Sequence, residues 1–413
     1  MNILLICNKS PWPAGEGGPI AMNAIIEGLL DAGHKVKVLA INSHKYNIDL
    51  ESIPEAYKRN TNIELVYIDL KVRALPAFAN LFSQSSYHVN RFISKPFADA
   101  LEKILKAGRF DVIQLESLFI TPYIPLIRKY SKAPVILRAH NIEHLIWQRL
   151  YKGEKNLLKK WYLKHLAITL KNYELKAIKE VNGIVAITNK DADFFAGYLP
   201  SDRVISIPFG LQPNLFASYV NTSAQGSVKD LMPETGNPTL FHLGSMNWLP
   251  NQEGIKWFIE QVWPDVFMMH KELSFHLAGR NMPGWIKETK TDGVIVDGEV
   301  PDALNYMRKH KIMIVPLFSG SGIRIKIIEG MLAGCAIITT RIGAEGINCE
   351  NGKHLLLAES KQEFISAINK LIIDKDYANQ MGNEARQFVI SNHDNEKLIM
   401  QLETFYIQHI NQK

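Results

Sequence analysis

Short apolar segments alternate with helix-like segments along this chain, and the alternation occurs in two series. Segments that are apolar throughout are typical of strands buried on both faces of a parallel sheet, with helices covering the sheet. We therefore predict an α/β fold with two Rossmann-like, doubly wound domains that face across a cleft. The predicted strands are Ile3–Cys7, Lys35–Ile41, Ile63–Ile68, Val112–Leu115, Val135–Leu137 and Gly183–Thr188, then Leu240–Leu243, Ser274–Ala278, Val294–Val296, Ile312–Leu317, Ala336–Thr340 and Leu355–Leu357.

The length of the chain and one polar stretch place the boundary between the domains. A chain of 413 residues is too long for one ordinary compact core. Ser218–Pro238 is rich in Ser, Thr, Asn, Gly and Pro, as expected of a surface loop just past a linker. We predict a first domain over residues 1–209 and a second over residues 210–387. A C-terminal helix over about residues 388–413 is expected to cross back and complete the first domain.

Composition limits the classes of protein to which the chain can belong. Hydrophobic residues make up 46% and charged residues 21% of it, which excludes a mostly disordered chain and a long coiled coil. No run of about 18 apolar residues is present, and the start lacks the basic segment of a signal peptide, so we expect a cytoplasmic protein. Three cysteines cannot pair without leaving one over, and we expect reduced thiols.

The net charge of +6 is concentrated in one segment of the chain. Arg149–Lys179 holds nine basic and two acidic residues, and nine minus two gives +7. Trp161, Tyr162 and Leu157–Leu158 are interleaved with these charges. One interpretation is a basic amphipathic helix in peripheral contact with an anionic membrane. The other is a solvated helix face whose apolar stripe belongs to the core. Neither interpretation predicts a nucleic-acid partner.

A loop of glycine and serine between a strand and a helix carries the clearest sign of a ligand. Gly320–Gly322 follows a predicted strand, and Ser319 or Ser321 is placed to cap the helix that comes next. The free N–H groups and the positive end of the helix dipole favour an anion at this point. Arg324 and Lys326 come within about one turn, where cations oppose the dipole unless an anion is bound. A phosphate is the simplest explanation.

The same helix and the N-terminal loop narrow the kind of phosphate ligand. Glu329 is placed to accept hydrogen bonds from ribose, although a solvated Lys326–Glu329 pair is the alternative. No Gly-Lys-Ser/Thr follows the glycine loop, so it is not a Walker loop. Gly15, Gly17 and Gly18 do not complete G-x-G-x-x-G, and no acidic residue ends the second strand. These absences argue against an NAD-dependent dehydrogenase.

Several fragments in a fixed order give the chain a resemblance to a known family. They are Gly17-Gly18, Gly33–Val38, Gly244–Asn251, Val300–Asp302, Gly320–Gly330 and Gly343–Gly346. Together they resemble the family-4 glycosyltransferases of GT-B fold, from Met1 to about Arg386. The resemblance implies a retaining enzyme that transfers a sugar from a nucleotide-sugar donor without a metal ion. The sequence holds no His/Cys cluster with metal-ligand spacing, so we expect no metal ligands and no cofactor beyond the donor.

The resemblance assigns the nucleotide-sugar donor to the second domain. Arg324 and Lys326 would meet the diphosphate as catalytic groups, and Glu329 would meet the ribose. Arg280, just after the strand Ser274–Ala278, is a reserve cation. The other donor-binding residues that the resemblance implies are Gly244 and Ser245 after the first strand, Gly298 and Val300 against the base, and Gly320, Ser321 and Gly322 in the loop.

Two departures from the family pattern affect this assignment. Many relatives carry two glutamates eight positions apart, and the first would fall at Ser321, so contact with the donor sugar must come from elsewhere, such as backbone amides. Relatives often have Arg and Lys where this chain has Ser245 and Asn251. The charge for the leaving diphosphate then falls more heavily on Arg324 and Lys326.

In the first domain the resemblance points to the ends of two strands. Gly17 and Gly18 would let backbone approach the donor phosphates or the acceptor. His140 would face the transferred sugar as a catalytic residue, with Asn141 and Glu143 on the acceptor side. In a doubly wound fold this strand end opens into the ligand crevice. The alternative role for His140 and Asn141 is to cap the helix that follows them.

The expected function is transfer of a sugar from a nucleotide-diphosphate sugar to a glycan or lipid-linked acceptor, in the biosynthesis of a cell-surface polysaccharide or glycolipid. One alternative is a nucleotide-sugar epimerase on the same fold, which would need a carboxylate pair for proton transfer. The other is a non-catalytic nucleotide-sugar-binding protein, which the departure at Ser321 keeps open. The sequence does not indicate the donor sugar, its base or the acceptor.

Overall fold

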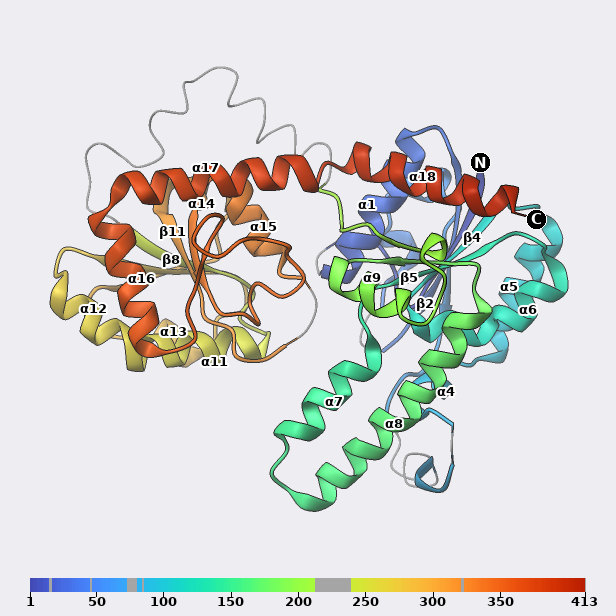
Figure 1. The fold of residues 1–413 in the computed structure, drawn as a ribbon, viewed down its shortest axis with the longest axis horizontal. Coiled ribbons are helices and arrows are strands. Elements are labelled where there is room, and N and C mark those ends of the chain that lie inside the picture. The colour runs from blue at the N-terminus through green and yellow to red at the C-terminus, as the bar shows by residue number, and fades with distance from the viewer. Residues whose placement is uncertain are drawn as a thin grey trace. The chain divides into compact units, whose positions relative to one another are not determined.

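The computed structural model describes residues 1–14, 17–44, 47–72, 80–83, 85–211, 239–320 and 323–412 (Figure 1). The chain divides into two compact units, which are Met1–Gln212 with Asn395–Lys413, and Pro213–Asp394. They are called the first and the second unit below. The polar stretch Ser218–Pro238, expected to form a surface loop, lies outside the described residues.

The first unit is built on a parallel sheet of seven strands in the order β3-β2-β1-β4-β5-β6-β7. The six predicted strands are all present. A seventh was not predicted, because β7 has only three residues and does not stand out as an apolar run. The strands are β1 (Asn2–Cys7), β2 (Lys35–Asn42), β3 (Glu64–Tyr67), β4 (Val112–Glu116), β5 (Val135–Ala139), β6 (Gly183–Ala186) and β7 (Val204–Ser206).

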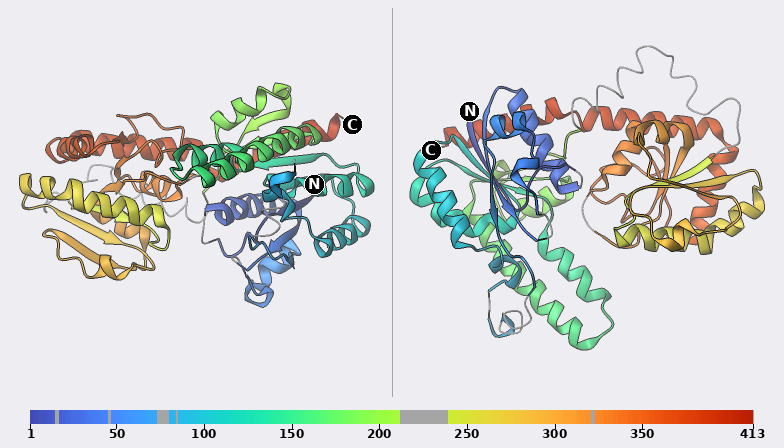
Figure 2. Two further views of the ribbon diagram at one scale, coloured as in Figure 1. Left: turned by 90° about the horizontal axis from the view of Figure 1, so that it is seen from below. Right: turned by 180° about the vertical axis from the view of Figure 1, so that it is seen from behind.

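Helices from both ends of the chain cover this sheet (Figures 1 and 2). The C-terminal helix α18 packs on the first unit, where its Leu402 and Phe405 join an apolar cluster with Ile25 of α1 and Val38 of β2. The hydroxyl of Tyr406 donates a hydrogen bond to Gln114 in β4. The helices are α1 (Gly17–Asp31), α2 (Glu55–Thr61), α4 (Tyr87–Asn90), α5 (Lys95–Ala107), α6 (Ile124–Tyr130), α7 (Glu143–Gly153), α8 (Leu157–Glu180), α9 (Asn189–Ala196) and α18 (Asn395–Asn411).

The second unit repeats the architecture on a parallel sheet of six strands in the order β10-β9-β8-β11-β12-β13. Its strands are β8 (Thr239–Leu243), β9 (Ser274–Ala278), β10 (Val294–Gly298), β11 (Lys311–Val315), β12 (Ala336–Thr339) and β13 (Leu356–Leu357). Its helices are α11 (Leu249–Trp257), continued by a π-helical turn (Phe258–Val262), α12 (Trp263–Met269), α13 (Gly284–Lys287), α14 (Ala303–His310), α15 (Ile325–Leu332), α16 (Lys361–Ile373) and α17 (Lys375–Asn392).

In each sheet, the strands are added in sequence order first on one side of the starting strand and then on the other. The reversal falls between β1 and β4 in the first unit and between β8 and β11 in the second. Two doubly wound, Rossmann-like sheets are therefore confirmed. At such a reversal the loops after the two neighbouring strands diverge to opposite faces, and a crevice opens at the carboxyl ends of the strands. Ligands are therefore expected at the carboxyl ends of β1 and β4 in the first unit and of β8 and β11 in the second.

A helical hairpin departs from the compact shape of the first unit. Helices α7 and α8 are joined by residues 154–156, and the hairpin projects away from the sheet (Figure 1). The second half of α8 is anchored by buried Leu166, Leu170 and Ala177. Among the described residues, no helix is both long enough and apolar enough to span a membrane.

Candidate functional site

The proposed donor-binding residues of the second unit gather at the carboxyl ends of its strands. Gly244 follows β8, Arg280 comes two residues after β9, and Val300 comes two residues after β10. Gly320 lies in the loop between β11 and α15, while Ser321 and Gly322 lie outside the described residues. Because parallel strands end at the same edge of a sheet, segments that run from Gly244 to Gly320 in the sequence are brought together here.

Among the residues that the structure describes, the side-chain partners of Lys326 at this edge are both neutral. Its Nζ atom donates to Oδ1 of Asn251 at 2.7 Å and lies 3.2 Å from Nε2 of His242. His242 is fully buried, and its Nδ1 lies 2.8 Å from the carbonyl oxygen of Ile314, which can only accept. Nε2 of His242 therefore carries the lone pair that receives the lysine proton. Burial, and then the charge of Arg324, lowers the pKa of Lys326 to about 7.

Gly244 makes room for this lysine. A Cβ atom on Gly244 would lie 2.9 Å from Nζ of Lys326 and 3.0 Å from Nδ2 of Asn251. The same Nδ2 donates to the carbonyl oxygen of Ser245 at 2.8 Å. Asn251 therefore links the turn after β8 to the amine of Lys326. Relatives often have a cation at the position of Asn251. In this chain Asn251 instead orients the cation of Lys326.

Arg324 lies at the start of α15 and is buried, with 5% of its surface exposed. Its guanidinium carbon lies 5.2 Å from the ring centroid of Trp248, a cation–π distance. Burial lowers the pKa of Arg324 to about 10, although the charge of Glu345 acts in the opposite direction. The prediction that Ser319 or Ser321 caps this helix is wrong, because the N-cap residue is Arg324 itself.

Glu329 follows Lys326 by three positions on α15 and is half-buried. Among the described residues, no side chain forms a hydrogen bond or an ion pair with its carboxylate, so the alternative of a surface Lys326–Glu329 pair is wrong. Burial raises the pKa of Glu329 to about 7. The carboxyl group can therefore accept hydrogen bonds from a ligand without first breaking bonds within the protein.

The remaining donor-side residues are less specialised. The hydroxyl of Ser245 donates to Oδ1 of Asn247 at 2.7 Å. Arg280 is exposed and forms an ion pair with Glu299, with 3.0 Å between Nε and Oε1. Gly298 has a φ of +75°, and Val300 is half-buried in the turn that follows it. Arg280 is thus available only if a ligand displaces Glu299, which fits its status as a reserve cation.

In the first unit, His140 lies directly after β5 and is paired with a buried carboxylate. Nε2 of His140 lies 2.7 Å from Oε2 of Glu116, the last residue of β4. Nε2 of Gln114 donates to Oε1 of Glu116 at 2.6 Å, and Nη1 of Arg138 lies 3.6 Å from Oε2. Burial alone would raise the pKa of Glu116, but Arg138, His140 and Gln114 together lower it below its usual value. His140 is therefore oriented by an ionised carboxylate.

Gly17 and Gly18 lie in the first turn of α1 rather than before it. A Cβ atom on Gly18 would lie 2.6 Å from Nζ of Lys9. Lys9 comes two residues after β1, at the strand reversal of the first unit. The glycine therefore admits a cation to the N-terminus of α1. The glycines stand out in the sequence, whereas no local pattern indicates the role of Lys9.

Asn141 and Glu143 lie at the start of α7, but neither His140 nor Asn141 caps it. The N-cap residue is Ile142, and the carboxylate of Glu174 from α8 accepts the backbone N–H groups of Glu143 and His144 at 3.0 and 3.1 Å. Burial, and then the charge of Glu174, raises the pKa of Glu143 to about 8, against the effect of a hydrogen bond with Asn141. The alternative capping role is wrong.

A profile described as Glycosyltransferase Family 4 matches residues 17–215, and one described as Glycosyl transferases group 1 matches residues 237–374. Each match falls on one of the two doubly wound units. The chain belongs to the GT-B glycosyltransferases. The resemblance expected from the sequence, the GT-B fold and transferase activity are thereby confirmed.

Relatives of this glycosyltransferase span nearly its whole length. An uncharacterized 44.6 kDa protein in the cps region of Klebsiella pneumoniae is 20% identical and covers 96% of the chain and 97% of its own length. Among solved structures, sucrose-phosphate synthase from Thermosynechococcus elongatus matches with a TM-score of 0.69, 15% identity and full coverage of both chains. Anabaena HepE, solved in complex with UDP, matches at 0.63 with 14% identity over 98% of this chain and 99% of its own. At identities this low, the two structural matches establish the fold alone.

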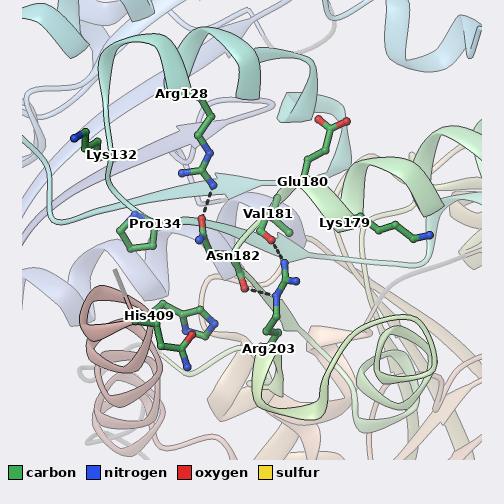
Figure 3. A pocket seen from close by; sticks show the side chains of 10 residues that line it. Arg128, Lys132, Pro134, Lys179, Glu180, Val181, Asn182, Arg203 and His409 are labelled. Atoms are coloured by element: carbon green, nitrogen blue, oxygen red, sulfur yellow. Dashed lines mark hydrogen bonds between the residues drawn. The ribbon is translucent and has the colours of Figure 1, made fainter.

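A cavity of about 370 Å³ in this glycosyltransferase lies away from the candidate site (Figure 3). It opens near Pro134 and Asn182, which precede β5 and β6, whereas His140 follows β5. Arg128 donates to Oδ1 of Asn182, and Nε of Arg203 donates to its carbonyl oxygen at 2.8 Å. These hydrogen bonds join the loops at the amino edge of the sheet. The cavity therefore does not enter the chemistry proposed below.

Proposed function

We propose that this glycosyltransferase is a retaining, metal-independent enzyme that transfers a sugar from a nucleotide-diphosphate sugar to a glycan or lipid-linked acceptor. The observation that carries the proposal is the amine of Lys326, whose partners Asn251 and His242 are neutral. A half-buried cation with no counter-ion among the described residues is costly unless a ligand supplies the anion. A diphosphate placed between Lys326 and Arg324 would supply it.

The proposed chemistry rests on charge stabilisation and positioning. As the bond between the anomeric carbon and the diphosphate oxygen breaks, negative charge grows on the leaving group. Arg324 and Lys326 would stabilise that charge, and Glu329 would hold the ribose hydroxyls. In a retaining transfer the bond to the acceptor oxygen forms on the same face of the sugar, and the acceptor hydroxyl passes its proton to the departing diphosphate oxygen. No metal ion and no cofactor beyond the donor is required in this proposal.

His140 would bind the transferred sugar in this proposal. Since the carboxylate of Glu116 is ionised, Nε2 of a neutral His140 donates to it and Nδ1 is left with the lone pair. Nδ1 can accept a hydrogen bond from a sugar hydroxyl. Glu116 would position the ring, and Asn141 and Glu143 would lie on the acceptor side.

The relatives support the class of donor and of product. HepE was crystallised with UDP and with UDP-glucose, and S. aureus TarM was crystallised with UDP and alpha-GlcNAc-glycerol. The Klebsiella pneumoniae relatives are proteins of the cps region. We therefore propose a role in the biosynthesis of a cell-surface polysaccharide or glycolipid, with the enzyme in the cytoplasm.

Incubation with UDP-, GDP- and ADP-sugars tests the proposal. We expect slow hydrolysis of one donor class, measured as nucleotide release, and a loss of about 100-fold in Arg324→Ala and Glu329→Ala, as typical of groups that stabilise a transition state. Lys256→Met, which changes an exposed lysine of α11, is the control. Tight nucleotide binding without turnover on any acceptor would show a non-catalytic binder, and an inverted anomeric centre would contradict retention.

The epimerase alternative needs a pair of carboxylates free to move protons. Glu143 and Glu174 are close enough for the charge of one to raise the pKa of the other. However, Glu174 is occupied by two backbone N–H groups and by Nδ1 of His144, which lies 2.5 Å from Oε2. This arrangement favours a structural role for the pair. An epimerised donor recovered from the incubation above would show the alternative activity.

The α7–α8 hairpin is the part of the enzyme through which we propose peripheral contact with an anionic membrane. Leu157, Leu158 and Trp161 at its tip have 80%, 82% and 60% of their surface exposed. Lys159 and Lys160 flank them within the basic segment Arg149–Lys179. These apolar side chains at the tip are exposed to solvent and do not belong to the core. Only in the second half of α8 are the apolar side chains buried in the core. Exposed leucines beside lysines suit a surface of anionic lipids.

Vesicle sedimentation tests the hairpin separately from catalysis. We expect the enzyme to bind vesicles containing phosphatidylglycerol, and Leu157→Ser/Leu158→Ser to weaken the binding about tenfold or more, since each leucine loses apolar transfer energy. Ile373→Ser, which removes another apolar side chain with 77% exposure, is the matched control. Equal binding by wild type and the double variant, or no preference over phosphatidylcholine, would contradict the proposal.

A further inference from the structure

Three side chains with metal-ligating atoms meet on one face of the second sheet. His276 in β9 and Asp297 in β10 are on adjacent strands, and His310 ends α14. Nδ1 of His276 lies 2.9 Å from Oδ2 of Asp297, and one ligand atom from each of the three residues lies within 4.8 Å of the others. We propose that these residues bind one divalent transition-metal ion. This site goes beyond the proposed glycosyl transfer.

The strand pattern explains why the three residues share a face. Along β9, Phe275 and Leu277 point into the main core of the second unit, so His276 points to the opposite face. On that face its ring centroid lies 4.2 Å from the ring centroid of His310. Phe241 of β8, whose ring centroid lies 6.0 Å from that of His310, closes the inner side. The polar cluster is thus built into the packing of α14 against the sheet.

Thr239 fixes the orientation of the His310 ring and leaves Nε2 of that ring unprotonated. The hydroxyl of Thr239 donates to the carbonyl oxygen of His310 at 3.2 Å, so its oxygen is left to accept from Nδ1 of the same residue at 3.0 Å. Nδ1 therefore carries the proton, and Nε2 carries the lone pair that a metal ion needs.

The other two ligands also have an outer partner. Nε2 of His276 lies 3.1 Å from the hydroxyl of Ser274, which leaves Nδ1 of that ring toward Asp297. The hydroxyl of Tyr306 donates to Oδ2 of Asp297 at 2.7 Å. Outer hydrogen bonds of this kind orient ligands in known metal sites and strengthen binding. A chance cluster of surface groups would not need a partner for every ligand.

The ligand set indicates the class of ion. Two imidazoles and one carboxylate suit Zn²⁺, Co²⁺ or Ni²⁺, whereas Mg²⁺ and Ca²⁺ prefer oxygen ligands. The side chain of Asp297 is 27% exposed and that of His276 is 13% exposed, so water can complete the coordination. A bound ion would tie β10, at the edge of the sheet, to α14. It would have no part in the transfer chemistry and would stabilise the second unit.

Calorimetry on the chelator-treated chain with ZnCl2 and CoCl2 tests the site. We expect one tight ion per chain, a cobalt absorption spectrum with imidazole ligands, and a higher melting temperature when the ion is bound. His276→Gln and Asp297→Asn should each weaken binding by 100-fold or more, and Thr239→Val by about 10-fold, as outer-partner changes do. His270→Gln, a second-unit histidine paired with Asn369, is the control for adventitious binding.

The outcomes separate the site from the glycosyltransferase proposal. Binding that is weak, or equally strong in His276→Gln, Asp297→Asn and wild type, would overturn the metal site and leave a hydrogen-bonded cluster. Donor hydrolysis is measured without added metal, so its presence or absence does not depend on this result. Circular dichroism of each variant shows whether a loss of metal binding is caused by unfolding. If His276→Gln does not fold, Asp297→Asn still tests the site, because asparagine keeps an oxygen that accepts the hydrogen bond from Tyr306.

Discussion

The two strand reversals of this enzyme hold charge in opposite ways. In the first unit, the carboxylate of Glu116 lies among Arg138, His140 and Gln114, so that opposite charges compensate one another within the protein. In the second unit, Lys326 has two neutral partners, and burial lowers its pKa to about 7. The charges of the first site are paired within the protein. At the second site, Lys326 has no acidic partner among the described residues, which is the property expected of the donor side.

This difference also separates the roles of glutamates in the two units. Glu116 is held ionised by its neighbours, whereas burial raises the pKa of Glu329 to about 7 and no described side chain compensates it. A group satisfied by the protein stabilises the fold. A group left unsatisfied costs stability and is retained where a ligand repays the cost. Substitutions at the two sites should therefore have opposite effects on folding.

The largest expected effect is destabilisation of the first unit by Glu116→Gln. Removing the carboxylate leaves Arg138 buried without its counter-charge, which costs about 3 kcal/mol. Because the pKa of Glu116 is lowered in the folded state, this stability is present above about pH 4.5 and is lost as the pH falls. Urea unfolding across pH 3–7 measures it (the range follows from the ordinary carboxyl pKa, about 4). Glu55→Gln changes an exposed glutamate and is the control. An equal loss of unfolding free energy in Glu55→Gln would contradict the difference drawn between the two sites.

Glu329→Gln should act in the opposite direction on the second unit. The folded state keeps the proton up to about pH 7, whereas the unfolded chain loses it near pH 4.5, so the free energy of unfolding falls as pH rises between these values. The variant should therefore be more stable than wild type by about 1–3 kcal/mol above pH 7 and equal to it below pH 4.5. Thermal unfolding at pH 4 and pH 8 measures the difference. Glu260→Gln, an exposed change, should show none.

Gly244→Ala is expected to have the smallest effect. The new methyl group would meet Nζ of Lys326 at 2.9 Å, but the end of a lysine side chain can move aside. Affinity for nucleoside diphosphates should fall about 5-fold, which is roughly 1 kcal/mol, while the fold is unchanged. Gly284→Ala, where the nearest atom would be 3.7 Å away, should leave affinity unaltered. A larger loss at Gly284 than at Gly244 would argue against the site.

Sequence patterns predicted the sheets because both consist of apolar runs. Ile312–Leu317 and Ala336–Thr340 are continuous apolar segments, and both contain strands. Helix starts were less well predicted. Glu174 caps α7 from 31 positions away, and no local pattern can reveal a partner that only folding brings near. For the same reason the start of α15 was placed too early by the serines of its loop.

Site residues followed the same rule. The placement of Arg324, Lys326 and Glu329 around one helix start could be read from the sequence because it is a local feature, and their role in donor binding stays a prediction. Glu116 and His242 could not, since each acts through a partner 24 or 84 positions away. A weak signal did exist. Both are buried polar residues in mostly apolar strands, and a polar residue buried in a strand must find a partner.

Calorimetric titration of nucleoside diphosphates at pH 8, in buffers of different ionisation enthalpy, tests the central claim most directly. Because the pKa of Lys326 is about 7 before an anion binds, the account predicts that binding takes up close to one proton. Lys326→Met should abolish that uptake and weaken affinity about 100-fold, while Lys256→Met keeps both. Absence of binding by any nucleotide, or unchanged proton uptake in Lys326→Met, would contradict the assignment of the second unit as the donor side.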